Sequence, residues 1–385
     1  MHSPFGPGPY PDSSDSDAET LRMGCATEKK AVQAPKKRRL RFKQPSPIVK
    51  KVLMFAHMLH MSASQISLMM KYQLPPVMFW IHYKYGSQWG PVCYDTVEFF
   101  AGCKAWTKGM AARGFETATF EMLDDPVHQN IMNSYGFLYA CELAMLTIDY
   151  LGFGWLAVLC STWIWMCRAS TGRSKWNPLG HKGRTSAKTE HGNVMMARAA
   201  AIMRLYGARR IDSCLEQPDN SCGPTGEPRM SATINLLEMK KTKISMGNFR
   251  GPSKKDMQLW SQGEWVPGLY RKFDRAMMGT PPAMPLTVPN EGPAGGVNGA
   301  AGLKDSQAYT LEFGHACASL FDLWRHRTEA EAARFKEADE MRALADTTLD
   351  NDEAWQVTDP WDDGEMFKVA ADLNLPNDRM PWSPC

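Results

Sequence analysis

The sequence predicts an α/β fold with a mostly parallel, doubly wound sheet that an antiparallel hairpin closes, and with disordered chain ends. Its 385 residues are 44% hydrophobic, which is enough to bury a large core. Strand-like and helix-like segments alternate through residues 91–275, the pattern of parallel strands joined by helices. Outside this region the chain is rich in Pro, Gly and charged residues, and such a composition disfavours a packed core.

The alternation begins near residue 95. Strands are expected at residues 95–100, 116–121, 154–160 and 210–216, and helices at residues 103–114, 125–150, 191–207 and 229–239. Gly114 is expected to close the first helix, because glycine readily adopts the left-handed conformation of helix ends. A break in the second helix is expected near Gly136. Residues 243–248 and 257–261 then form the closing hairpin.

The N-terminal residues 1–47 are expected to form a disordered basic arm, because they hold too few apolar side chains to offset the entropy of ordering. Residues 35–41 read Pro-Lys-Lys-Arg-Arg-Leu-Arg, which is typical of a nuclear-import signal or a nucleic-acid-binding arm. A solubilising tail without a specific reader is equally open. We expect a nuclear protein, with a helical prelude at residues 48–90.

The C-terminal third changes character twice. Residues 276–307 are dense in Pro, Gly and Ala and are expected to form a linker, which an amphipathic helix follows at residues 308–346. The expected core-facing positions of this helix are Leu311, His315, Leu320, Leu323, Trp324 and Phe335. Residues 347–385 form an acidic tail whose isolated tryptophans are of the kind that dock on a partner or on the protein's own basic face.

Composition also excludes several classes of protein. No segment approaches the roughly 20 uninterrupted apolar residues of a membrane helix, and residues 1–17 lack the features of a secretory signal. We therefore expect an intracellular protein without a membrane partner. The ten cysteines are scattered through apolar segments, so reduced and mostly buried thiols are expected. No His or Cys cluster has zinc-binding spacing, so no metal site is predicted, and the oligomeric state stays open.

The loop after the first strand is the first candidate for ligand binding. In an open parallel sheet the ligand lies beyond the carboxyl ends of the strands, where the topology switches. Gly102 allows close approach of the backbone, and the free N–H groups of the following helix suit a carboxylate or phosphate. Glu98, in the first strand, and Glu121, at the end of the second, supply acceptors for an amine and for ribose hydroxyls.

The same residues carry a resemblance to a known family. Residues 97–103 read Val-Glu-Phe-Phe-Ala-Gly-Cys, and Gly-Phe-Glu at 114–116 and Phe-Glu at 120–121 follow. This pattern resembles the opening motif of the cytosine-C5 DNA methyltransferases. The resemblance covers residues 95–261 and implies a Rossmann-like methyltransferase domain that binds S-adenosylmethionine. It also implies that Phe100 and Gly102 line the cofactor and that Glu121 holds its ribose.

Two later segments extend the resemblance to catalysis. Leu-Cys-Ser-Thr-Trp at 159–163 follows the third strand, where the family has its Pro-Cys-Gln loop, so Cys160 falls on the nucleophile. Leu-Glu-Gln-Pro at 215–218 stands where the family has Glu-Asn-Val, so Glu216 falls on the acid that faces the base. Methylation at C5 of cytosine needs a thiolate that adds at C6 and an acid at the ring nitrogen, because the ring carbon alone is a poor nucleophile.

The chain departs from the family pattern at several positions. Lys104 stands where a second glycine is usual, Leu159 replaces the proline before the nucleophile, and no Gln-x-Arg-x-Arg element is found. Each candidate also has a plainer interpretation. Cys160 could be an inert buried thiol with a raised pKa, and Glu216 could cap a helix or pair with a nearby arginine.

Cations beside these segments suggest nucleic acid, with DNA favoured. The candidate phosphate-binding residues are Arg168, Arg173, Lys175, Arg250 and Lys254. The first three belong to an insert at residues 168–191 that also contains Trp176, and an aromatic among cations suits an unpaired base. A solvated surface loop is the alternative.

Three functions stay open on the sequence alone. The leading one is an S-adenosylmethionine-binding protein that methylates cytosine in nucleic acid, with Cys160 and Glu216 as catalytic residues. The second is an inactive protein of the same fold that binds nucleic acid or protein. The third is a methyltransferase for another class of substrate that does not use the cysteine.

Overall fold

A computed structural model describes the fold for most of the chain between Tyr94 and Ala345. The described residues are 71–72, 74, 94–164, 167–180, 187–281, 285–289, 297–299, 302–305 and 308–345. The expected basic arm, nearly all of the helical prelude and the acidic tail lie outside these residues. Among the helices that the structure describes, none has both the length and the apolar character that a membrane span requires.

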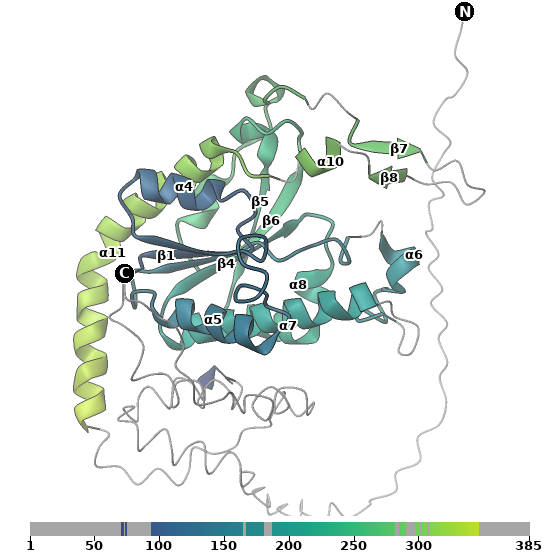
Figure 1. The fold of residues 1–385 in the computed structure, drawn as a ribbon. Helices are drawn as coiled ribbons and strands as arrows, with labels where there is room; N and C mark the ends of the chain where they lie inside the picture. The colour runs from purple at the N-terminus through teal and green to yellow at the C-terminus, as the bar shows by residue number, and fades with distance from the viewer. Residues whose placement is uncertain are drawn as a thin grey trace, which may run out of the picture. The chain divides into compact units, whose positions relative to one another are not determined.

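A mixed, mostly parallel sheet of six strands forms the centre of the fold (Figure 1). Its strands are β1 (Thr96–Phe99), β2 (Thr117–Phe120), β3 (Phe153–Leu156), β4 (Asp212–Pro218), β5 (Lys240–Ser245) and β6 (Asp256–Ser261). They lie in the order β2-β1-β3-β4-β6-β5. The first four are parallel, and β6 is antiparallel to both of its neighbours. The α/β class and the expected hairpin are therefore confirmed, while the sheet itself stays open, with β2 and β5 at its edges.

Helices cover both faces of this sheet (Figure 1). On one face lie α4 (Ala105–Ala112) and α11 (Leu311–Ala345), and on the other lie α5 (Ser134–Met145) and α7 (Ala187–Ala208). Helix α9 (Pro228–Leu236) contacts α7. The shorter elements are α6 (Arg168–Thr171), α8 (Gly223–Gly226), α10 (Gly302–Asp305), β7 (Thr287–Pro289), β8 (Val297–Gly299) and the 3-10 turns η2 (Met246–Phe249), η3 (Val266–Leu269) and η4 (Arg275–Met277).

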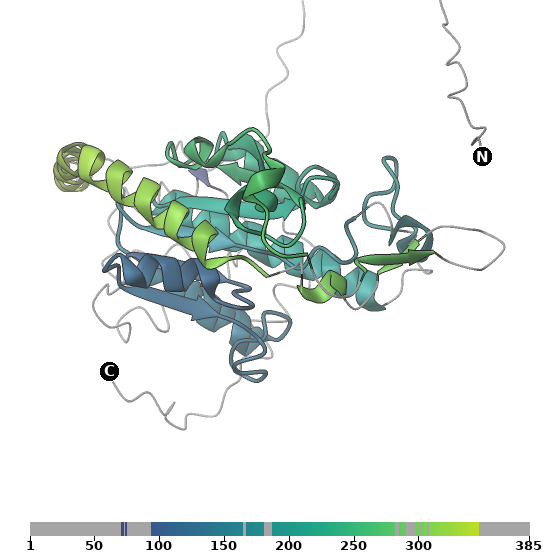
Figure 2. The same ribbon diagram turned by 90° about the horizontal axis from the view of Figure 1, so that it is seen from above.

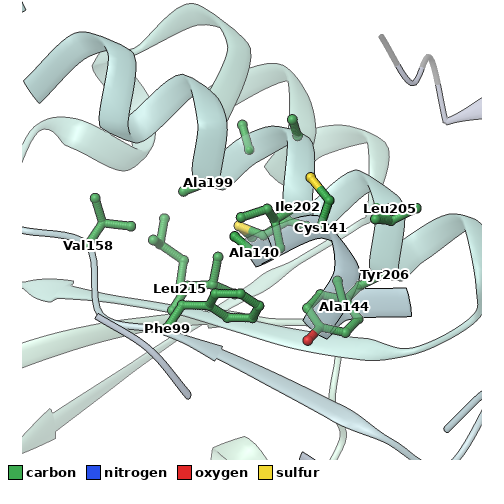
Figure 3. Packing of buried hydrophobic residues seen from close by; sticks show 14 of the residues in the cluster. Phe99, Ala140, Cys141, Ala144, Val158, Ala199, Ile202, Leu205, Tyr206 and Leu215 are labelled. Carbon is green, nitrogen blue, oxygen red and sulfur yellow. The ribbon is translucent and has the colours of Figure 1, made fainter. Parts of the chain in front are cut away.

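The alternation of side chains along the strands divides the core into two layers. Phe99 and Leu215 point toward α5 and α7, where they meet Ala140, Ile202 and Tyr206 in a buried apolar interface (Figure 3). The set is fully buried, which explains why the strands read as short apolar runs rather than as half-polar ones. The intervening residues point the other way, toward α4 and α11, and this second layer is rich in aromatic rings.

Helix α11 reaches the sheet by crossing α4 at two glycines. A Cβ atom on Gly109 would lie 2.2 Å from the carbonyl carbon of Gly314, and a Cβ on Gly314 would lie 2.2 Å from the carbonyl oxygen of Ala105. Both distances are far inside van der Waals contact, so the two backbones can touch only because neither residue has a side chain. This close approach places α11 and α4 side by side when seen from above (Figure 2). It allows Phe313 and Phe321 to be fully buried.

The expected core face of α11 is largely wrong. Leu311, Leu323 and Phe335 are 51%, 58% and 53% exposed, and His315 is exposed as well. The buried positions are instead Phe313, Cys317, Phe321 and Trp324, so only Trp324 was placed correctly and Leu320 is half-buried. The contact through Gly314 fixes the rotation of the helix, and this turns residues 313, 317, 321 and 324 toward the sheet.

Other element boundaries also differ from expectation. Helix α5 occupies only part of the expected 125–150 segment, because the Asn133 side chain accepts a hydrogen bond from the Gly136 N–H and caps the helix there. Before it, the Asp125 carboxylate accepts two backbone N–H groups and holds a turn. Strand β3 ends at Leu156, so Cys160 lies in a loop, and β5 begins three residues earlier than expected. The expected linker contains β7, β8 and α10.

Candidate active site

The strand order identifies the carboxyl ends of the parallel strands as the place to look for a ligand. The connection from β1 through α4 leads to β2 on one side of β1, and the connection from β2 through α5 leads to β3 on its other side. The chain therefore changes direction at the carboxyl ends of β1 and β3. In open α/β sheets, ligands bind at such a switch point.

The loop that leaves β1 has the backbone expected for close contact with a ligand. Phe100, Gly102 and Lys104 adopt positive φ angles of 60°, 50° and 58°. A Cβ on Gly102 would meet no atom within 4 Å, so the loop is open at this point. Lys104 adopts a conformation that glycine favours, and its ammonium pairs with Asp124 at 2.6 Å. The loop thus keeps a glycine-like shape although lysine replaces the usual second glycine.

Glu121 joins this loop to the end of β2. Its Oε2 accepts the N–H of Gly102 at 2.8 Å, and its Oε1 accepts the N–H of Leu123 at 3.0 Å. Both carboxylate oxygens therefore shape the two loops. Each oxygen has a second lone pair, so Glu121 keeps the capacity to accept hydroxyl groups as well.

Glu98 is a buried acid with half of its carboxylate unsatisfied. The side chain is fully buried, and its Oε2 accepts both the N–H and the hydroxyl of Thr107 in α4, at 3.0 and 2.5 Å. Its Oε1 has no hydrogen-bond partner among the described residues. Burial raises the pKa of Glu98 to about 7, against the opposing hydrogen bonds from Thr107. A buried acid of this kind, with a free acceptor at a ligand-binding edge, is a functional candidate.

Glu216 lies near the end of β4, on the same face of the sheet as Glu98. It contacts a residue that is distant in the sequence. The hydroxyl of Tyr309 donates to its Oε2 at 2.9 Å, and the indole N–H of Trp155 donates to that hydroxyl at 3.3 Å. Glu216 is 7% exposed, and burial raises its pKa, while Lys255 and the Tyr309 hydrogen bond act in the opposite direction. Of the two arginines before β4 that were possible partners, Arg209 pairs with Asp149 at 2.7 Å instead.

Cys160 lies in the loop after β3 and interacts electrostatically with Glu216. Its thiol is half-buried, and burial raises its pKa to about 11, with a further contribution from the Glu216 charge. Lys255 lowers the pKa of both Cys160 and Glu216. Cys160 and Glu216 are therefore close enough for the charge of Glu216 to act on the thiol, and Lys255 acts on both residues in the opposite direction.

Two substitutions near Cys160 should shift the pKa of its thiol in opposite directions. Glu216→Gln is expected to lower the pKa of Cys160 from about 11, because it removes a nearby negative charge, and Lys255→Gln is expected to raise it. Alkylation of Cys160 by iodoacetamide, followed by peptide mass spectrometry between about pH 8 and pH 10, measures the thiolate fraction. The rate should rise in Glu216→Gln and fall in Lys255→Gln. Equal rates in both variants and the wild type would contradict the arrangement.

Sequence reasoning missed two residues of this cluster. Lys255 is adjacent to Lys254, a predicted phosphate-binding residue. The Lys-Lys pair at 254–255 is the sequence signal that could have indicated Lys255 as well. Tyr309 had no local signal, because it lies 93 residues from Glu216 in the chain. Its backbone carbonyl also accepts from the Cys103 thiol at 3.5 Å, so Tyr309 links the loop after β1 to the end of β4.

The insert after Cys160 is a braced turn. Arg173 is 3% exposed, and its guanidinium donates to the carbonyls of Thr162, Pro178 and Thr189 and lies 3.4 Å from the centre of the Trp163 ring. These contacts stabilise the loop. Because its guanidinium is buried and bonded to carbonyl groups, Arg173 is not positioned to bind a phosphate of a nucleic acid.

The tip of that insert is exposed. Backbone hydrogen bonds in both directions between Ser174 and Asn177 close a tight turn, which presents Lys175 and Trp176 to solvent. Trp176 is 88% exposed. Arg168 begins α6, before this turn.

The remaining predicted cations lie in the connection between β5 and β6. Arg250 and Lys254 are exposed in the β5–β6 connection, and Lys254 pairs with Asp256 at 2.9 Å. The register of β4 with β6 places this connection beside the end of β4, where Pro218 pairs with Met257. Exposed cations therefore lie in the connection beside the end of β4, the strand that carries Glu216.

No family model matches the chain, and no curated protein matches it either. Within the described part of the chain, no group of three or more His, Cys, Asp or Glu side chains could hold a metal ion.

Proposed function

We propose that this chain is an S-adenosylmethionine-binding protein of the cytosine-C5 methyltransferase type, and that it methylates cytosine in nucleic acid. One observation carries the proposal: Cys160 and Glu216, from the ends of two adjacent strands, interact beside the switch point of the sheet, as this reaction requires. The order of the four parallel strands, β2-β1-β3-β4, agrees with a doubly wound, Rossmann-like class of sheet.

The residues around the switch point fit the proposed cofactor. S-adenosylmethionine carries an ammonium, a ribose diol and, on its sulfonium, an electrophilic methyl group. The unsatisfied Oε1 of Glu98 is a buried acceptor suited to the ammonium. The remaining lone pairs of Glu121 suit the ribose hydroxyls, and the open backbone at Gly102 permits close approach. Phe100 lies in the same loop and would line the cofactor.

The protein's own residues divide the proposed chemistry between them. Addition of the Cys160 thiolate at C6 forms a carbon–sulfur bond and moves electron density toward C5 and the ring nitrogen. The raised pKa of Glu216 favours its protonated form, which donates a proton to that nitrogen. Protonated Glu216 no longer raises the pKa of Cys160, while Lys255 favours the thiolate. Thiolate formation is therefore coupled to the protonation of Glu216.

An inactive interaction protein with the same fold is the second candidate. The observation that favours it is the pKa of Cys160, which at about 11 leaves the thiol protonated near neutral pH. Cofactor binding is the first property that separates the two candidates.

The test uses Glu98→Gln in the full chain. Below about pH 4 wild-type Glu98 is neutral in both states, and stability is lost as pH rises through the folded pKa of about 7. At about pH 8 the glutamine variant should therefore be more stable than the wild type, by roughly 3 kcal/mol. It should nevertheless lose S-adenosylmethionine binding in isothermal titration, because the neutral amide cannot balance the ammonium.

Asp212→Asn is the matched control. Burial also raises the pKa of Asp212 to about 7. Asp212 is the first residue of β4, however, and so lies near Glu264 at the amino ends of the parallel strands, away from the proposed site. This variant should gain stability at about pH 8 and bind the cofactor as the wild type does. If the folded wild type shows no binding, the methyltransferase proposal fails and the interaction protein is the better reading.

A further inference from the structure

Exposed cations gather along one border of the proposed site. We call Arg250, Arg271, Lys272 and Arg275 the cationic strip. All four side chains are exposed, and none forms an ion pair with a carboxylate among the residues that the structure describes. Between residues 250 and 275 the chain holds six cations against three acids, and one of these acids, Glu264, lies beside Asp212 at the far edge. The strip therefore carries uncompensated positive charge.

A buried asparagine holds the two halves of the strip together. Asn248, 2% exposed, donates from its side chain to the carbonyl of Arg271 at 2.9 Å and accepts the N–H of Asp274 at 2.9 Å. Phe273 packs on Gly247, where a Cβ would lie only 2.8 Å from its ring. An irregular segment is thus fixed against the β5–β6 connection, so its charges are held in place before any partner binds.

The position of the strip links it to the catalytic residues. In the register of β5 with β6, Ser245 pairs with Asp256, so the connection between them lies at the edge where β4 ends. Lys255 belongs to this connection and acts electrostatically on Cys160 and Glu216. The strip therefore begins within a few residues of the site and leads away from it.

We propose that the cationic strip binds the phosphate backbone of a nucleic acid strand, and that Tyr270 stacks on one of its bases. A row of cations without carboxylate partners among the described residues suits a polyanion with repeated charges. Tyr270 is 63% exposed beside the strip, and an aromatic ring among cations matches the way proteins hold single strands. The choice of nucleic acid over other polyanions rests on the proposed function.

The test measures oligonucleotide binding by the full chain at several salt concentrations. In Arg271→Gln/Lys272→Gln/Arg275→Gln, the affinity for a single-stranded oligonucleotide should fall and the slope of log affinity against log salt should become shallower by about two. The matched control is Arg327→Gln/Arg334→Gln/Lys336→Gln, which removes the same charge from exposed positions of α11. Those positions follow Arg325, which pairs with Asp95 at the opposite edge, and the control should keep the wild-type slope.

Tyr270 has a separate readout. Tyr270→Ala should weaken single-strand binding by about tenfold with an unchanged salt slope, and Tyr270→Phe should restore it, because stacking needs the ring and not the hydroxyl. Equal losses in the two triple variants would show a dependence on net charge alone and would overturn the proposal. Binding to anionic phospholipid vesicles without binding to oligonucleotides would overturn it as well.

The cofactor titration separates this inference from the proposed function. The strip variant should bind S-adenosylmethionine as the wild type does, since its three substitutions lie in the segment after β6 and not in the loops after β1 and β2. If the wild type binds oligonucleotides through the strip but binds no S-adenosylmethionine, the strip stands and the methyltransferase proposal fails.

Discussion

Cys160→Ser is expected to abolish methyl transfer to cytosine, by a factor on the order of 10⁴ or more, because a hydroxyl in this setting does not supply the nucleophile that the addition needs. Binding of S-adenosylmethionine should be unchanged, because Cys160 lies in the loop after β3 and not in the loop after β1. The measurement is transfer of a labelled methyl group to cytosine-containing oligonucleotides by the full chain. Glu216→Gln should show a comparable loss through removal of the acid.

Cys103→Ser is the control for this experiment. Its thiol is exposed at the same edge and its Sγ donates only to a backbone carbonyl, so activity should persist. Methylation that survives in Cys160→Ser would exclude the covalent mechanism and would point to a different class of substrate. A wild type that binds the cofactor but transfers no methyl group would favour the inactive interaction protein.

Gly109→Ala is expected to destabilise the fold by about 3 kcal/mol, because the added methyl group would collide with backbone rather than with an adaptable side chain. Alanine's higher helix propensity, worth about 1 kcal/mol, offsets only part of this cost. Gly314→Ala should behave in the same way from the other helix. The melting temperature should fall by roughly 5–10 °C in each variant.

Gly268→Ala provides the comparison on the same face. A Cβ there would lie 3.2 Å from the end of the Leu320 side chain, which can move aside, so the loss should stay below about 1 kcal/mol. If Gly109→Ala were as stable as Gly268→Ala, the close crossing of α4 and α11 would be wrong. A second consequence is functional: separation of α11 should disturb Tyr309 and with it the hydrogen bond to Glu216.

The elements that local patterns determine were predictable from the sequence. Strands β1, β2 and β4 lie within two residues of their expected positions, because short apolar runs bounded by glycine or charge are a local signal. Gly114 has a φ of 94° and closes α4 as expected. Cys160 and Glu216 were placed by the family resemblance, and their catalytic roles stay a prediction; in the structure the charge of Glu216 raises the pKa of Cys160.

Features that depend on distant contacts could not be predicted. The rotation of α11 is fixed by one glycine contact, and its sequence alone offers several apolar faces. Arg173 resembled a phosphate ligand because a buried guanidinium bound to carbonyls and an exposed one look the same in a sequence. Tyr309 needed knowledge of the whole fold, since its partner Glu216 lies in another element far along the chain.

The dependence of Glu216 on Tyr309 has a consequence for the order in which the protein matures during synthesis. All six strands of the sheet have left the ribosome once Ser261 has emerged, yet the hydroxyl that contacts Glu216 comes 48 residues later. Trp155 likewise waits for the same hydroxyl to accept its indole N–H. The contact with Glu216 can therefore form only after the segment that carries Tyr309, which directly precedes α11, has emerged and docked on the sheet.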